Sequence, residues 1–162
     1  MPRPRYPVTP AIRFLRSKQV DFHSFIYSYT DHGGARQAAV ELHIPEHQVV
    51  KTLVMETEDL SPLLMLMHGD QAVSTRQLAR VIGAKKVLPV SPEKALHYTG
   101  YQVGGISPFG TRQKMPVFVQ ATILGLKTIY INGGKRGFIV EIVPAALLKT
   151  LAAIPVDVAT FS

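Results

Sequence analysis

Residues 49–68 read VVKTLVMETEDLSPLLMLMH, and this stretch predicts the centre of the fold. Two largely apolar runs, Val49–Glu56 and Leu63–His68, have the length and the aliphatic composition of buried strands. The polar residues Glu58–Ser61 between them are typical of a turn. We therefore expect two consecutive strands at the heart of the domain.

The elements on either side of this stretch predict a mixed α+β domain. Helices are expected from start and stop signals at Pro10–Gln19 (capped by Thr9), Ala35–Leu42, Ser74–Ile82 (ended by Gly83), from Pro92 (capped by Ser91) and from Pro144. Further strands are expected at Phe22–Tyr29, Val87–Val90, Pro116–Gln120, Lys127–Ile131 and Phe138–Val143. Helices do not regularly follow the strands, so a doubly wound sheet is disfavoured. We expect a mixed, curved sheet or barrel surrounded by helices.

Length and composition indicate one globular domain. The chain has 162 residues, of which 46% are hydrophobic, so residues 1–162 are expected to form a single core with a flexible, proline-rich arm at 1–8. There is no cysteine, which excludes disulfides, thiolate nucleophiles and cysteine-ligated metal sites. The start lacks the apolar run of a secretory signal, and the longest apolar stretch, around Pro62–Met67, is too short to span a bilayer. We expect a cytoplasmic protein without a membrane partner.

The charge favours a polyanionic partner. Eighteen Lys and Arg against 11 Asp and Glu give a net charge of +7, and phosphates attract such a surface. The basic residues form no dense run, so a nucleic-acid-binding tail is not indicated. The alternative, a basic soluble protein without such a partner, stays open at this point.

Two glycine-rich segments are candidate binding loops. They are Gly104–Gly110 (GGISPFG) and Asn132–Gly137 (NGGKRG), the second between two expected strands. Glycine lets the backbone approach a ligand closely, and successive N–H groups can bind an oxyanion or phosphate. Each loop alone could equally be a turn. Neither matches a Walker A or dinucleotide-binding pattern, so those functions lose support.

Lys51 is the charged residue that stands out within an apolar strand. A lysine in such a run reaches solvent, pairs with an acid or lines a cavity. Alternation could also place it on the solvent face of the sheet. From the pattern alone, both interpretations remain.

The histidines do not predict a metal site. His43-Ile44-Pro45-Glu46-His47 matches H-x-x-E-H, but Pro45 breaks the helix that would bring both imidazoles to one zinc ion. His43 and His47 are expected to be solvated linker residues. His68 ends a strand, where it is more often structural than a catalytic base. We expect neither metal nor cofactor.

Four segments together resemble the YbaK family and the editing domain of prolyl-tRNA synthetases. They are Val50–Val54, Leu78–Val87, Thr99–Gly110 and Ile129–Gly137, and the resemblance extends from about Thr9 to Asp157. It implies an aminoacyl-tRNA deacylase acting in trans, with Cys-tRNA(Pro) or another small amino acid on tRNA(Pro) as the favoured substrate. Transfer RNA is the implied partner and prolyl-tRNA synthetase a second candidate; DNA is not expected.

The resemblance also implies a pocket for the tRNA 3′-terminal adenosine and its ester. Lys51 and Gly104 would be catalytic, with the oxyanion held by backbone N–H groups of Gly104–Ser107 and with help from a substrate hydroxyl or thiol. The substrate-binding residues would be Tyr27, Gly105, Ile106, Ser107, Asn132, Gly133, Gly134 and Lys135. This sequence departs from the family at Asn132, where serine is frequent, and at Ile139, where aspartate is frequent.

Those departures leave two alternatives to a deacylase. One is a tRNA-binding module of the same fold that has lost turnover. The other is a regulatory protein that binds a small phosphorylated ligand through the glycine loops. Assays of ester hydrolysis separate the deacylase from the binding module.

Overall fold

The computed structural model describes residues 5–161, and it is built around one mixed sheet. The strands are β1 His23–Ile26, β2 Val49–Thr57, β3 Pro62–His68, β4 Gln71–Val73, β5 Val87–Pro89, β6 Val117–Gln120, β7 Ile129–Lys135, β8 Phe138–Ile142, β9 Ile154–Val156 and β10 Ala159–Phe161. The sheet order is β1-β8-β7-β2-β3-β6-β9, with β5 also beside β2, while β10 and β4 form a small second sheet.

The central pair confirms the expectation from residues 49–68. Strands β2 and β3 run antiparallel, with Lys51 opposite Met67 and Glu56 opposite Pro62. Around them β2–β7, β3–β6 and β6–β9 pair in parallel, so the sheet is mixed as predicted. Its path is open at β1 and β9. The α+β prediction is confirmed, with an open curved sheet in place of a closed barrel.

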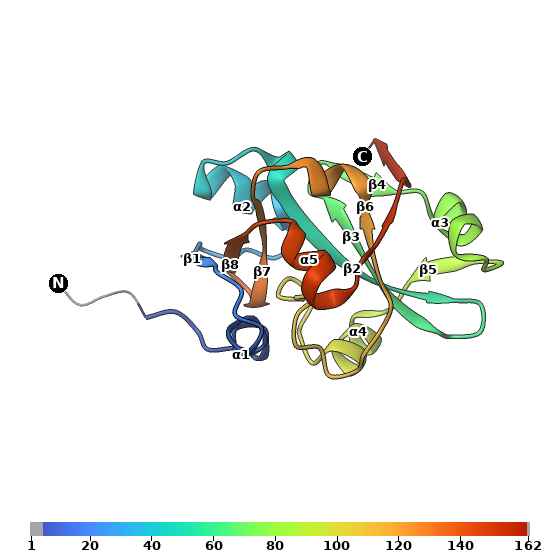
Figure 1. Cartoon of the computed structure of the whole chain (residues 1–162), viewed down its shortest axis with the longest axis horizontal. Helices are drawn as coiled ribbons and strands as arrows, with labels where there is room; N and C mark the ends of the chain where they lie inside the picture. Colours follow the sequence, from blue (N-terminus) through green and yellow to red (C-terminus); the bar gives the residue numbers. More distant parts are fainter. Residues whose placement is uncertain (1–4, 162) are drawn as a thin grey trace.

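Short helices surround this sheet (Figure 1). They are α1 Pro10–Ser17, α2 Gly34–Leu42, α3 Thr75–Ile82, α4 Pro92–Thr99 and α5 Ala145–Leu151, with 3-10 turns η1 Glu46–Gln48 and η2 Ala121–Gly125. The predicted caps form: the hydroxyls of Thr9, Ser74 and Ser91 accept from the N–H three residues on. Across residues 5–161 no helix has the length and apolar character to cross a membrane.

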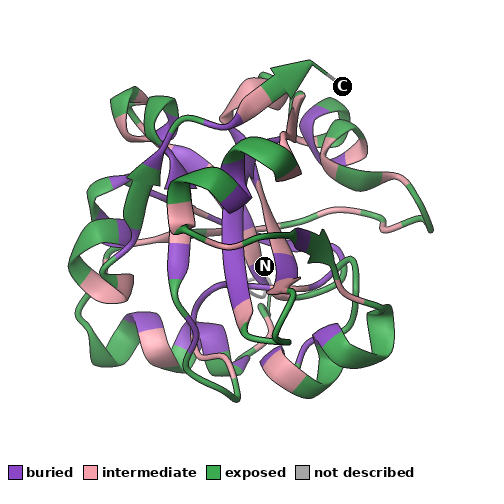
Figure 2. Ribbon diagram, turned by 90° about the vertical axis from the view of Figure 1, so that its right-hand side faces the viewer, coloured by how far each residue is buried: buried purple, intermediate pink, exposed green. Residues whose placement is uncertain are grey.

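Alternation along β2 and β3 divides the core between two faces of the sheet. Val54 and Leu66 belong to the larger cluster, which α1, α4 and α5 help to enclose. Met55 and Met65 belong to the smaller cluster, which packs against α3. Figure 2 shows the buried strands at the centre and helices exposed on their outer sides. Burial on both faces explains why these strands are almost continuously apolar in sequence.

The remaining differences from the sequence-based elements lie in short strands and in β7, which is Ile129–Lys135 where Lys127–Ile131 was predicted. The strand predicted at Phe22–Tyr29 is only His23–Ile26, because the chain leaves the sheet after Ile26 to form a loop. Strands β4, β9 and β10 have three residues each and were not predicted. Such short strands lack a readable period and depend on pairing with distant partners.

The predicted flexible arm is partly outside the described residues. Residues 1–4 are not described. Among the rest of the arm, the ring of Tyr6 stacks on Phe138, with 6.4 Å between the ring centroids. This contact attaches residue 6 to the sheet next to the NGGKRG segment.

Candidate active site

An interruption in the sheet creates the site. Strand β7 pairs with β2 at Val49 and Val50, and β5 pairs with β2 at Met55–Thr57. Between these contacts, residues 51–54 of β2 have no ladder partner on that side. An open strand edge inside a folded domain presents N–H and C=O groups that a ligand can use.

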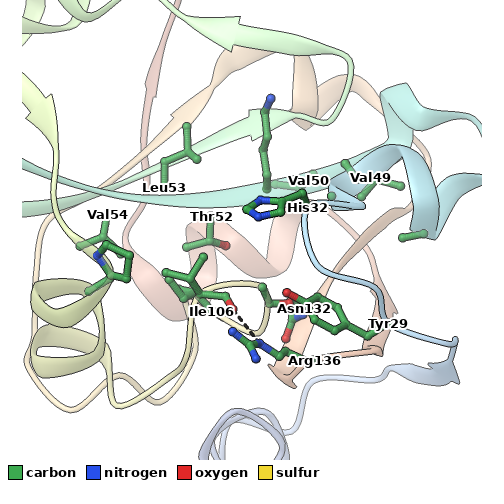
Figure 3. Close-up of a pocket in the computed structure, with 18 of the residues that line it drawn as sticks. Tyr29, His32, Val49, Val50, Thr52, Leu53, Val54, Ile106, Asn132 and Arg136 are labelled. Atoms are coloured by element: carbon green, nitrogen blue, oxygen red, sulfur yellow. Dashed lines mark hydrogen bonds between the residues drawn. The ribbon is translucent and has the colours of Figure 1, made fainter.

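A cavity of about 570 Å³ lies along this open edge (Figure 3). Its walls come from the loop before α2, from β2, from the turn between β5 and α4, from the glycine-rich loop and from the β7–β8 hairpin. The lining residues are mostly apolar and include Tyr27, Tyr29, Asp31, His32, Gly34, Ala35, Ala38, Val49–Met55, Pro89, Val90, Pro92, Ala95, Val103, Gly104, Ile106, Asn132, Arg136 and Ile139. This size suits a small organic group rather than a macromolecule.

Thr52 is the polar residue that β2 directs into this space. The N–H of Val90 donates to the carbonyl oxygen of Val54 at 3.1 Å, so the Val54 carbonyl faces the open edge. Thr52 lies two residues earlier, and its backbone groups therefore point to the same edge. Its hydroxyl oxygen is buried and has no hydrogen-bond partner among the described residues. A buried polar atom without a partner is a candidate ligand contact.

Lys51 also lines the cavity, as the resemblance implied. Burial lowers the pKa of its ammonium, while attraction from Glu46 and Asp70 offsets part of that effect. The side chain is neither fully solvated nor fully enclosed. Lys51 can therefore act as a point charge at the cavity wall.

Two tyrosines, Tyr27 and Tyr29, and Gly104 also line the cavity. Gly104 has φ +91°, and a Cβ there would lie 2.6 Å from the hydroxyl oxygen of Tyr29. Burial raises the pKa of the Tyr27 hydroxyl, and the neighbouring Tyr29 and Glu41 add to the effect. Tyr27 is therefore a neutral hydroxyl rather than a phenolate base at ordinary pH.

Asn132 connects the two glycine-rich segments. Its amide nitrogen donates to the carbonyl oxygen of Gly104 at 3.1 Å. Its carbonyl oxygen accepts from the N–H of Gly134 at 2.7 Å and of Lys135 at 3.1 Å. One side chain thus holds the glycine-rich loop against the β7–β8 hairpin. Position 134 favours glycine, because its φ is +98° and a residue with a side chain would be strained there.

The expected site residues fall into two groups in the structure. Tyr27, Lys51, Gly104, Ile106 and Asn132 line the cavity. The remaining five lie behind its wall or outside it: Gly105, Ser107, Gly133, Gly134 and Lys135.

Close packing explains the position of this second group. A Cβ at Gly105 would lie 2.7 Å from the backbone nitrogen of Arg136, and one at Gly133 would meet the Phe138 ring. Ser107 is fully buried, and its hydroxyl accepts from the N–H of Phe109 at 3.2 Å. Lys135 is exposed and outside the lining. Gly105, Gly133 and Ser107 are thus in structural environments, whereas Lys135 is a surface residue.

Fewer backbone N–H groups than expected are therefore available to bind an oxyanion in the cavity. The N–H of Gly105 already donates to the carbonyl of Gln102 at 2.8 Å. Within residues 5–161 no hydrogen bond uses the N–H of Gly104 or Ile106, and both residues line the cavity. These two amides are the available pair for a developing negative charge.

Sequence reasoning missed Thr52, Tyr29, His32 and Arg136. The Arg136 guanidinium lies 5.1 Å from the centroid of the Tyr29 ring, and its Nε donates to the carbonyl of Val103 at 2.9 Å (Figure 3). Thr52 and Arg136 stand next to residues that the motifs did select. Tyr29 and His32 belong to a loop that has no motif, so only the tertiary structure brings them to the cavity.

The residues of the histidine cluster do not line the cavity, although His68 lies opposite the cavity residue Val50 in the β2–β3 pair. His68 is fully buried, with Nδ1 2.7 Å from the carbonyl oxygen of His47 and Nε2 2.7 Å from the hydroxyl of Thr122. The rings of His47 and His68 stack with centroids 3.7 Å apart, and His47 Nδ1 lies 2.9 Å from an Asp70 oxygen. His47 is thus engaged rather than free in solvent, contrary to expectation.

His47, His68 and Asp70 form the candidate metal-ligand group among the residues that the structure describes. Their ligand atoms lie within 4.8 Å of one another. Both nitrogens of His68 already have partners, so a metal ion would have to displace Thr122 or the His47 carbonyl. The arrangement favours a structural role.

Comparison with known proteins assigns the chain to a family. The family model for the aminoacyl-tRNA editing domain matches residues 33–150. The chain belongs to the aminoacyl-tRNA editing domain family. An Enterococcus faecalis protein proposed to be a Cys-tRNA(Pro)/Cys-tRNA(Cys) deacylase, EbsC, is 29% identical over 142 residues, which are 87% of each chain.

Two further relatives of this editing domain are more distant. A proline–tRNA ligase of Limosilactobacillus fermentum is 24% identical over 106 residues, covering 63% of this chain and 18% of the ligase. The crystal structure of a proposed trans-editing enzyme for prolyl-tRNA synthetase has a TM-score of 0.81 at 22% identity, covering 95% of this chain and 99% of that one. The fold expected from the resemblance is therefore confirmed.

The two departures from the family pattern lie together in this editing domain. Asn132 and Ile139 are direct cross-strand partners in β7 and β8, and both line the cavity. Ile139 is 3% exposed. An apolar side chain at this position makes the cavity wall less polar than an aspartate would. This difference in polarity affects which substrate group the cavity accepts.

Proposed function

We propose that this editing domain is a trans-acting deacylase that hydrolyses the ester of a mischarged tRNA, with Cys-tRNA(Pro) the first substrate to test. The observation that carries the proposal is the cavity at the open edge of β2, which combines apolar walls with unpaired backbone and hydroxyl groups. The relative of similar length described as a Cys-tRNA(Pro)/Cys-tRNA(Cys) deacylase supports the substrate. The net charge of +7 favours the tRNA.

In the proposed reaction water adds to the acyl carbonyl carbon and the ester C–O bond breaks. The products are the free amino acid and the tRNA with its ribose hydroxyl restored. The N–H groups of Gly104 and Ile106 would hold the oxyanion of the tetrahedral intermediate, and losing one such donor costs about 2.7–4 kcal/mol in other hydrolases. A ribose hydroxyl or the cysteinyl thiol of the substrate would assist, since none of the described lining residues forms the histidine–carboxylate hydrogen bond that orients a general base.

Thr52 and Lys51 would position the substrate. The Thr52 hydroxyl and carbonyl oxygens are suited to accept from the α-ammonium group of the aminoacyl moiety, which supplies the missing partner. Lys51 would hold a phosphate or the ester end as a charge. Apolar residues such as Ala38, Val50 and Ile139 would limit the amino acid side chain to a small, apolar group.

A panel of charged tRNAs tests the proposal. Purified protein is incubated with Cys-, Ala-, Ser- and Pro-tRNA(Pro) and with Cys-tRNA(Cys), and ester loss is followed against the uncatalysed rate. We expect faster loss of Cys-tRNA(Pro) while Pro-tRNA(Pro) is spared. Binding of tRNA without faster ester loss on any substrate would favour the non-catalytic tRNA-binding module, for which the apolar Ile139 is the motivating feature.

A further inference from the structure

The segment between β1 and α2 carries four cavity-lining residues, and one glutamine holds it. Tyr27, Tyr29, Asp31 and His32 line the cavity although this segment has no regular secondary structure before α2 begins. A loop of this kind is mobile unless side chains satisfy its backbone groups. The residue that does so is Gln37, in the first turns of α2.

The carboxamide of Gln37 uses both its oxygen and its nitrogen on this loop. The oxygen accepts from the N–H of Thr30 at 3.2 Å and from the Thr30 hydroxyl at 2.9 Å. The nitrogen donates to the carbonyl of Ser28 and, at 2.8 Å, to a carboxylate oxygen of Glu41. The other Glu41 oxygen accepts from the N–H of Ser28 at 3.3 Å. Two side chains one helical turn apart thus hold the residues on both sides of Tyr29.

Gly33 leaves the space that the Gln37 carboxamide occupies. A Cβ at Gly33 would lie 2.1 Å from the amide oxygen of Gln37, so a larger residue would push the carboxamide out of place. The φ of Gly33 is −67°, which any residue adopts, so space and not backbone conformation requires glycine here.

We propose that Gln37 is a positioning residue for the deacylase, acting through Tyr29. By fixing residues 28 and 30, it holds the Tyr29 ring between Gly104 and the Arg136 guanidinium. Tyr29 then limits the space beside Gly104, whose N–H is a proposed oxyanion donor. Gln37 does not line the cavity. It therefore influences which acyl groups fit and how Gly104 is oriented, without touching them. This inference rests on the function proposed above.

Substitution of Gln37 has two separable readouts. Gln37→Leu keeps the approximate volume and removes every hydrogen bond of the carboxamide. The Thr30 amide should then exchange about 3–10-fold faster in hydrogen-exchange NMR, the equivalent of one net hydrogen bond. Amides in β2 and β3 should be unchanged. The ratio of kcat/KM between Cys-tRNA(Pro) and a bulkier acyl-tRNA should fall about 10-fold, as expected when a pocket wall loosens.

A charge swap and a helix control sharpen the test. Gln37→Glu alone keeps an acceptor for Thr30 but loses the donor to Ser28 and faces Glu41 across one helical turn, so the discrimination should fall as it does in Gln37→Leu. Adding Glu41→Gln restores a donor between the two side chains and should recover most of the discrimination. Val40→Ala, at a 66% exposed position of the same helix, should change neither readout.

The outcomes distinguish the inference from the function on which it rests. Faster exchange at Thr30 with unchanged discrimination would overturn the positioning role and leave a deacylase in place. Unchanged exchange would overturn the loop contact itself. A wild-type protein that hydrolyses no charged tRNA would overturn the proposed function, and the positioning role with it, even if Gln37→Leu frees the loop.

Discussion

Asn132 donates its amide hydrogen to the carbonyl oxygen of Gly104 at 3.1 Å, so one side chain couples the β7–β8 hairpin to the glycine-rich loop. The same side chain accepts from two N–H groups of the hairpin. The resemblance implies that serine is frequent here, and a serine side chain is one bond shorter and carries one hydroxyl in place of the amide. The departure at this position therefore replaces a small polar group with a support for the proposed oxyanion site.

Asn132→Ala should lower kcat about 10²-fold, the effect of displacing a reacting group by about 1 Å. The physical reason is loss of the Gly104 contact, which leaves the loop free to move. Asn132→Asp is the matched variant, since it keeps an acceptor for the hairpin and loses the donor to Gly104. If the Asn132→Asp variant retained full kcat in single-turnover deacylation, the coupling would have no catalytic role.

Gly104→Ala should abolish deacylation at saturating tRNA. The new Cβ would meet the Tyr29 hydroxyl at 2.6 Å, and φ +91° disfavours every residue with a side chain. Gly125→Ala is the control, because a Cβ there meets nothing within 4 Å and its φ lies outside the disfavoured range. Equal kcat for both variants would show that Gly104 is only a turn residue.

Thr52→Val should lower deacylation activity without lowering the stability of the folded protein. The hydroxyl oxygen of Thr52 is buried without a partner among the described residues, so an isosteric apolar group should leave the free energy of unfolding unchanged or raise it slightly. If the hydroxyl accepts from the substrate ammonium, kcat/KM should fall about 10-fold, as expected for one hydrogen bond to a charged group. Urea unfolding and deacylation kinetics on the same preparation measure both effects. A variant that is more stable and fully active would remove Thr52 from the site.

Lys51→Ala should abolish deacylation without unfolding the protein, because its removal deletes a charge and leaves the apolar neighbours in place. The charge has a distinctive pH dependence. Burial lowers the Lys51 pKa, so a contribution that needs the ammonium should disappear as pH rises through a value below the ordinary one of about 10.4. Lys51→Arg stays charged over that range and should lack this decline.

The same lowered pKa predicts that Lys51, although needed for activity, lowers the stability of the folded protein. Burial disfavours the charged form of the Lys51 amine in the folded state. At neutral pH the amine is nevertheless charged, so Lys51 lowers the free energy of unfolding there. Lys51→Met should therefore raise the Tm at pH 7. The gain should shrink as pH rises through the lowered pKa of the folded state towards the ordinary pKa. Thermal melts at several pH values check this, and a Tm that falls at pH 7 would contradict it.

His68→Ala should act on stability rather than on chemistry. Both ring nitrogens of His68 have partners, and leaving these buried groups unpaired costs about 1–3 kcal/mol each. A catalytic base would instead contribute about 10²–10⁴-fold in rate. We expect a clear loss in urea-unfolding free energy, a much smaller change in kcat for folded protein, and no effect of EDTA on single-turnover rates. Inactivation by EDTA that zinc reverses would give the histidine cluster a catalytic role.

Local signals in the sequence were sufficient for much of the fold. Helix starts at Thr9, Ser74 and Ser91 depend on a side chain and an N–H three residues away, so the caps could be predicted and were confirmed. The two apolar runs in residues 49–68 predicted β2 and β3 because burial on both faces leaves a direct trace in composition. The resemblance then selected Lys51, Gly104 and Asn132, which the structure brings to one cavity.

Pairing between strands that are distant in the sequence determined the open edge of β2, which no local pattern predicts. Where β7 and β5 stop along β2 determines which of its backbone groups remain free, and those contacts join residues at least 30 positions apart. The same holds for Tyr29, which reaches Gly104 because Gln37 holds its loop. By itself the sequence determined the three capped helix starts, the central strands and the family. Only the tertiary structure decided that Thr52 faces an unpaired strand edge, because that depends on where distant strands end and not on any local pattern.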